Sequence, residues 1–160
     1  MQNEAADTAT RVFERPSTRL LLLAPAAVAL LAGLNAGLGL ADAPVPVTSA
    51  RLEGVHGMLM TLGFLGTLIA LERAVALRRP WGFLAPALLG AGGLALVLPL
   101  PLPVAQVLLV AGCGAFIAVY AALFRRSQDA LVLAQAMGAF YAFVAAGLWL
   151  FVELPDLTPW

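Results

Sequence analysis

The residues with the clearest capacity for chemistry are a histidine and a methionine four positions apart, His56 and Met60. A neutral imidazole is a good ligand for haem iron and for copper. A thioether is a soft ligand for copper(I) and an alternative axial ligand for haem. His56 is the only histidine, so a haem with two histidine ligands would need a partner chain, a dimer or a further part of this chain. Five-coordinate haem needs His56 alone.

These residues lie in a chain whose composition is typical of a membrane protein. Of the 160 residues, 62% are hydrophobic and 11% are charged, whereas soluble domains carry about 25% charged residues. Nine arginines balance nine acidic residues and there is no lysine, so nothing indicates a nucleic-acid partner. The single cysteine, Cys113, excludes an internal disulfide and a zinc cluster built on cysteines.

Hydropathy predicts an all-α, polytopic membrane bundle of five helices, because each apolar run approaches the ~20 residues that cross a bilayer core. The third run is rich in glycine at its middle. We expect a polar tail over 1–18, a membrane domain over 19–152 and an outer tail over 153–160. The predicted spans are 20–40, 52–77, 81–98, 104–124 and 130–152.

The first apolar run also has an alternative interpretation as a signal peptide. The sequence Ala41-Asp42-Ala43 resembles a cleavage site with small residues. The run is longer than a typical signal-peptide core, however, and Pro44 follows the cleavage position. We therefore interpret it as a membrane span.

The arginines predict the orientation, because cytoplasmic segments of membrane proteins carry an excess of Lys and Arg. With the N-terminus inside, only Arg51 falls on the outer side. The others fall inside: Arg11, Arg15, Arg19, Arg73, Arg78, Arg79, Arg125 and Arg126. We expect an N-in, C-out protein of a bacterial inner (plasma) membrane.

A helical wheel separates the polar residues of the second span onto two faces. His56 and Met60 share one stripe with small residues, namely Gly63, Thr67, Ala70 and Ala74. Small residues at this spacing let helices approach closely, and we expect the alanine face of the fifth helix to pack against them. Glu72 lies on the opposite face with Thr61, Leu65 and Leu68.

The position of Glu72 separates it from any site at His56, because it also lies near the inner end of the span. It is interpreted as an interfacial acid among arginines, with Arg125 or Arg126 as a partner, or alternatively as part of a proton relay.

The opposing interpretation of His56 is structural. A polar side chain in hydrocarbon is costly unless it has a partner or a function. The candidate polar neighbours on the outer side are Asn35, Glu53, Gln106 and Trp149. Asn35, Glu53 or Gln106, or interfacial water, would then satisfy the imidazole.

The segment His56-Gly57-Met58-Leu59-Met60, followed by Phe64, resembles one helix of two membrane protein families. It is similar to the second helix of the catalytic subunit of haem-copper oxidases, and to a pattern in the NnrS family of haem- and copper-containing proteins linked to nitric oxide stress. Both resemblances imply that His56 is a haem ligand. Both families carry further histidines that are absent here, so enzyme activity of this chain alone is not implied. The longer segment 63–77 also resembles a bacterial membrane family without an assigned function.

Three functions follow as hypotheses. The first is a protein that binds haem b, or copper, through His56 near the outer face in a redox or nitric-oxide-related role, with the small stripe leaving room for a flat macrocycle. The second is a non-catalytic accessory or scaffolding subunit, in a homo-oligomer or with other membrane subunits. The third is a small transporter, against which the separation of His56 and Glu72 argues. The sequence has neither a nucleophile–base pair nor a phosphate-binding loop, so it does not indicate a soluble type of enzyme.

Overall fold

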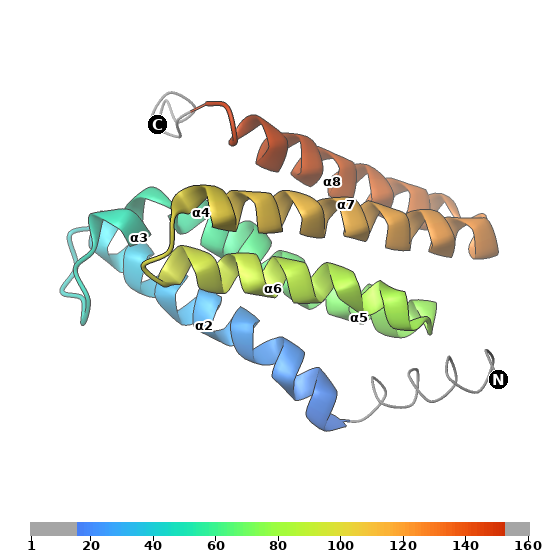
Figure 1. The fold of residues 1–160 in the computed structure, drawn as a ribbon, viewed down its shortest axis with the longest axis horizontal. Coiled ribbons are helices and arrows are strands. Elements are labelled where there is room, and N and C mark those ends of the chain that lie inside the picture. The colour runs from blue at the N-terminus through green and yellow to red at the C-terminus, as the bar shows by residue number, and fades with distance from the viewer. Residues whose placement is uncertain (1–15, 153–160) are drawn as a thin grey trace.

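The computed structural model describes residues 16–152, and this part of the chain is all-helical (Figure 1). Five helices are long and apolar enough to cross a membrane, which confirms the predicted class of a polytopic helical membrane protein. Most of the predicted tail over 1–18 and all of the tail over 153–160 lie outside the described residues.

The spans follow one another as antiparallel neighbours joined by short connections. The first span is α2 (Pro16–Leu40) and the second begins with the short α3 (Ala50–Gly54). The short 3-10 turn η2 (Pro80–Phe83) leads into the remaining long helices, which are α6 (Leu84–Val97), α7 (Leu102–Ser127) and α8 (Ala130–Leu148). The last of these, α8, ends before the predicted residue 152.

The second span is interrupted rather than one regular α-helix as its pattern predicts. Val55, with φ −114° and ψ 9°, separates α3 from α4 (His56–Met58). A π-helix, η1 (Leu59–Gly66), follows and passes into α5 (Thr67–Leu77). Within this segment the hydroxyl of Thr61 donates to the carbonyl oxygen of Gly57 at 2.7 Å, a local bond that competes with the regular backbone ladder. Helical segments with π geometry are rare and frequently occur at functional sites.

The alternating direction of the spans gives the bundle two distinct ends (Figure 1). We call the end at which α4 begins the His56 end. The opposite end, at which α5 and α7 terminate, is the arginine end. The arginine distribution predicts that the arginine end faces the cytoplasm.

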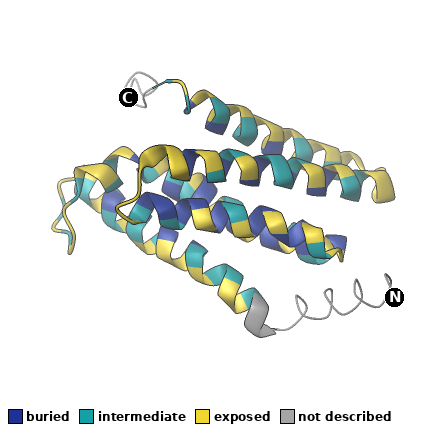
Figure 2. Ribbon diagram, in the orientation of Figure 1, coloured by how far each residue is buried: buried dark blue, intermediate teal, exposed yellow. Residues whose placement is uncertain are grey.

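The core of the bundle is α6, which is the most buried of the five spans (Figure 2). Three of its glycines allow close approach of three neighbours. A Cβ atom on Gly93 would lie 2.9 Å from the Cα atom of Gly63 in η1. Gly92 receives the side chain of Leu109 from α7, and Gly90 faces α2. Close backbone approach at small residues is the usual basis of helix association in membranes.

The predicted small-residue stripe of the second span is buried, but its partner differs from the expected one. Gly63 packs between α6 and Ala29 of α2, whose Cβ would lie 3.2 Å from a Cβ on Gly63. The other buried members are Thr67, Ala70 and Ala74. The alanine face of α8 packs mainly on α7 instead, so the expected pairing with the fifth helix is wrong. The glycines of α6 permit a closer approach than alanines would.

The opposite face of the second span is exposed, as the wheel predicts. Its members are Thr61, Leu65, Leu68 and Glu72. The predicted buried and exposed faces of the second span are therefore kept despite the π-helix.

The glycine contact in the core generates a stability prediction. Gly93→Ala places a methyl group against the backbone of Gly63, and overpacking of this kind costs about 1–3 kcal/mol. Gly138→Ala on α8 is the matched control, because a Cβ there meets nothing within 4 Å. Unfolding in mixed detergent micelles, followed by circular dichroism, should show a clear loss for Gly93→Ala and none for Gly138→Ala. Equal stabilities of the two variants would contradict the packing described.

Candidate functional site

His56 begins α4, directly after the break at Val55, and its ring reaches across to α2. The Nδ1 atom lies 2.8 Å from the carbonyl oxygen of Gly33. A carbonyl oxygen can only accept a hydrogen bond, so Nδ1 carries the hydrogen and donates it. In the neutral ring, Nε2 therefore holds a lone pair. Within the described residues Nε2 has no hydrogen-bond partner.

Two glycines of α2 form the slot that receives both candidate ligands. A Cβ atom on Gly37 would lie 2.9 Å from Cε1 of His56, and one on Gly33 would overlap the sulfur of Met60. This pair was not among the predicted site residues, although the spacing Gly33-x-x-x-Gly37 is itself a small-residue signal for close packing. The slot fixes where both side chains lie.

The expected space for a flat macrocycle along the small stripe is absent, and that expectation is wrong. Met60 is held against Gly33, and the smaller residues of the stripe are covered by α2 and α6. His56 itself is only half-buried. A ligand of His56 must therefore approach Nε2 from outside the stripe.

Two of the predicted polar neighbours of His56, Asn35 and Glu53, have other contacts instead. The side-chain amide of Asn35 donates to the carbonyl oxygen of Val47 at 2.7 Å and accepts from its N–H at 3.3 Å. Glu53 lies beside Gly39, where a Cβ would come within 2.9 Å of Oε1. The expectation that Asn35 or Glu53 is the hydrogen-bond partner of His56 is therefore wrong, because Nδ1 bonds the backbone carbonyl of Gly33.

The other two neighbours, Gln106 and Trp149, belong to a separate cavity. Both are buried, and the side-chain amide of Gln106 donates to the backbone carbonyl of Trp149 at 2.7 Å. This bond links the start of α7 to the end of α8 and does not involve His56. The cavity holds about 600 Å³ and is lined by Ala50, Arg51, Gly54, Val55, Leu102, Pro103, Gln106 and 149–152.

Arg51, the one arginine predicted to be outside, supports the C-terminus of α6. Its guanidinium donates to the carbonyl oxygens of Ala95 and Leu96, each at 3.2 Å, and of Leu100 at 2.7 Å. The last carbonyls of a helix lack intrahelical partners. Arg51 therefore joins the beginning of the second span to the end of the third.

Glu72 pairs with the adjacent Arg73 at 2.6 Å and is exposed. The suggested partners were Arg125 and Arg126, but Arg126 donates to the carbonyl of Leu77 at 3.0 Å. Glu72 and Arg73 line the end of a groove of about 450 Å³ between the second span and α7 and α8. The groove is otherwise mainly apolar, with Thr61, Cys113, Tyr120 and Gln135 among its lining residues.

The ligand chemistry available at this site is limited to single residues. Among residues 16–152, no group of three or more His, Cys, Asp and Glu side chains could hold a metal ion. His56 therefore offers one nitrogen, with the thioether of Met60 one turn away but engaged by α2.

Five helices that are long and apolar enough to cross a membrane, the third of them rich in glycine, define a polytopic helical membrane protein. More specifically, the chain belongs to the family described as a domain of unknown function, DUF8744, which matches residues 19–160. No curated protein and no solved structure matches the chain.

The His56–Gly33 bond generates a prediction about the tautomer. Because His56 is the only histidine, protein labelled with ¹⁵N-histidine gives signals from one ring. In its neutral form the ring should show a protonated Nδ1 and an unprotonated Nε2. The opposite tautomer would contradict the hydrogen bond.

The glycine slot supplies the matched variants for the same measurement. Gly37→Ala should displace the ring and shift both nitrogen signals, because the new methyl group would lie 2.9 Å from Cε1. Gly57→Ala adds a methyl group with nothing within 4 Å and should leave the signals unchanged. Equal shifts in the two variants would count against the slot.

Proposed function

We propose that this membrane protein binds haem b through Nε2 of His56, near the membrane face predicted to be the outer one. The observation that supports the proposal is the hydrogen bond from Nδ1 to the carbonyl of Gly33. Metal-binding histidines almost always donate their other ring N–H to a carbonyl, a carboxylate or water, which fixes the tautomer and raises the basicity of the ligating nitrogen.

The surroundings of His56 support an external partner for Nε2. The ring is half-buried in a membrane protein and uses one nitrogen for α2. Polar groups at such positions are costly when they lack a partner or a function. His56 also lies between the break at Val55 and the π-helix η1, and π segments are frequent at functional sites.

The position of Met60 favours haem over copper. A copper(I) site would draw on the thioether as well as the imidazole. Met60 is instead lodged against Gly33, which leaves His56 as a single ligand. The imidazole of His56 would then hold haem b by itself, and the haem would supply an iron centre able to bind a small gas such as nitric oxide.

The alternative functions draw less support from the arrangement of residues. An accessory subunit was expected to offer small-residue faces to its partners, yet Gly63, Gly90, Gly92 and Gly93 are already in contact within the chain. A transporter needs a polar path, whereas Glu72 pairs with Arg73 at the end of the bundle opposite His56.

The absorption spectrum of the protein, purified from cells supplied with haem, tests the proposal. We expect a Soret band that His56→Ala abolishes and that Met60→Leu retains, because only the imidazole would be a ligand. Circular dichroism of His56→Ala checks that the helices persist. Absence of the band in the wild type, or its persistence in His56→Ala, would refute the proposal.

A further inference from the structure

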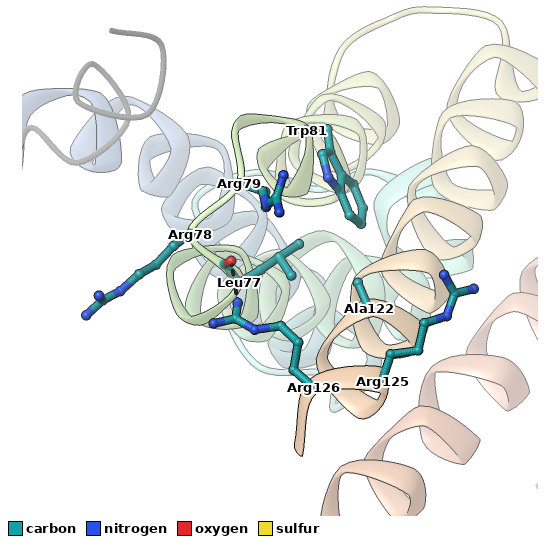
Figure 3. Close-up of a pocket in the computed structure, with 7 residues that line it drawn as sticks. All are labelled: Leu77, Arg78, Arg79, Trp81, Ala122, Arg125 and Arg126. Atoms are coloured by element: carbon teal, nitrogen blue, oxygen red, sulfur yellow. Dashed lines mark hydrogen bonds between the residues drawn. The ribbon is translucent and has the colours of Figure 1, made fainter. Parts of the chain in front are cut away.

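A cavity at the arginine end combines positive charge with an aromatic wall (Figure 3). It holds about 560 Å³. Arg79 and Trp81 come from the turn between α5 and α6, and Arg125 and Arg126 come from the last turn of α7. Two hairpins that are distant in sequence therefore supply its opposite walls.

The positive charge of this cavity has no acidic counterpart in its lining. Glu72, on the helix α5 that Arg78 and Arg79 follow, pairs with Arg73. Within residues 16–152, no ion pair involves the arginines of the cavity. A concave site lined by charges of one sign concentrates the counter-ion, so the cavity attracts anions.

One arginine of the cavity, Arg126, is held in place by the backbone. Arg126 donates to the carbonyl of Leu77 at 3.0 Å, which anchors the end of α7 to the end of α5 and leaves further N–H donors on the same guanidinium. Arg78 ends α5 in the left-handed conformation, with φ 54°. In Figure 3 its side chain points away from the other arginines, whereas Arg79 and Trp81 lie across the gap from Arg125.

We propose that this cavity binds a phosphoryl group, as carried by the headgroup of an acidic phospholipid. Guanidinium groups match phosphate oxygens with paired hydrogen bonds. Basic pockets between membrane helices on the cytoplasmic side are suited to anionic headgroups. Leu77, Ala122 and the exposed indole of Trp81 offer apolar contacts beside the charges. A soluble phosphorylated compound would present the same chemistry.

Membrane proteins in general carry more arginines on the cytoplasmic side. That rule concerns only how many arginines lie on that side, and does not require them to meet in one place. Here arginines from two separate hairpins converge on one cavity with an aromatic wall. The proposal is independent of His56 and of any haem.

Thermal unfolding of the purified protein in detergent tests the site with three additives: phosphatidylglycerol, phosphatidylcholine and inorganic phosphate. We expect phosphatidylglycerol to raise the melting temperature and phosphatidylcholine to leave it unchanged. Arg79→Gln should weaken the apparent affinity for phosphatidylglycerol about fivefold, and Arg125→Gln should do the same, since one arginine near an anionic surface contributes on this scale.

Arg73→Gln is the matched control, because it removes the same charge at the same end of the bundle from a residue that does not line the cavity. It should retain the wild-type affinity, and Arg125→Gln carries the comparison if Arg79→Gln does not fold. A response to inorganic phosphate equal to that of the lipid would support a phosphoryl site with a soluble ligand. Equal effects of the two phospholipids without a phosphate response, or an equal loss in Arg73→Gln, would overturn the proposal.

Discussion

The contact between Gly63 and Gly93 is the constraint on which the other helix positions depend. Helices in a membrane gain little from hydrophobic burial against one another, so close van der Waals packing decides which faces meet. With η1 this close to α6, α2 can lie across both of them at Ala29. The same placement of α2 brings Gly33 and Gly37 to Met60 and His56. The geometry of the candidate ligand is therefore a consequence of packing deeper in the bundle.

The π-helix connects that packing to the His56 end. A π-helix closes its hydrogen bonds over five residues instead of four, so side chains on either side of it are rotated relative to a straight α-helix. On this span, His56 and Met60 meet α2, while Gly63 meets both α2 and α6. The bond from Thr61 to Gly57 replaces part of the regular ladder at this point. One span can thereby contact two neighbours without a proline.

Composition and periodicity predicted what depends on one helix at a time: five spans, a buried small stripe and the exposed face of Glu72. They could not predict what depends on pairs of helices. The partner of His56 is the backbone carbonyl of Gly33, and a carbonyl has no signature in the sequence. The choice of α6 rather than α8 as the partner of the stripe follows from glycines in another span. The break at Val55 has no proline to mark it, and the hydropathy pattern predicted one helix through it.

The two ends of the bundle use arginine in the same way but differ in what remains unpaired. Arg51 satisfies the terminal carbonyls of α6 at the His56 end, and Arg126 does so for α5 at the arginine end. Cations are favourable at helix C-termini, where carbonyls carry partial negative charge. At the His56 end, the guanidinium of Arg51 is engaged by carbonyl oxygens. The polar atom without a partner there is Nε2 of His56, within the described residues. At the arginine end, Arg126 is engaged by the end of α5, whereas Arg79 and Arg125 line the cavity without taking part in this cap. Beyond the capping arginines, the described part of the chain thus presents an imidazole nitrogen without a partner at one end of the bundle and a positively charged cavity at the other.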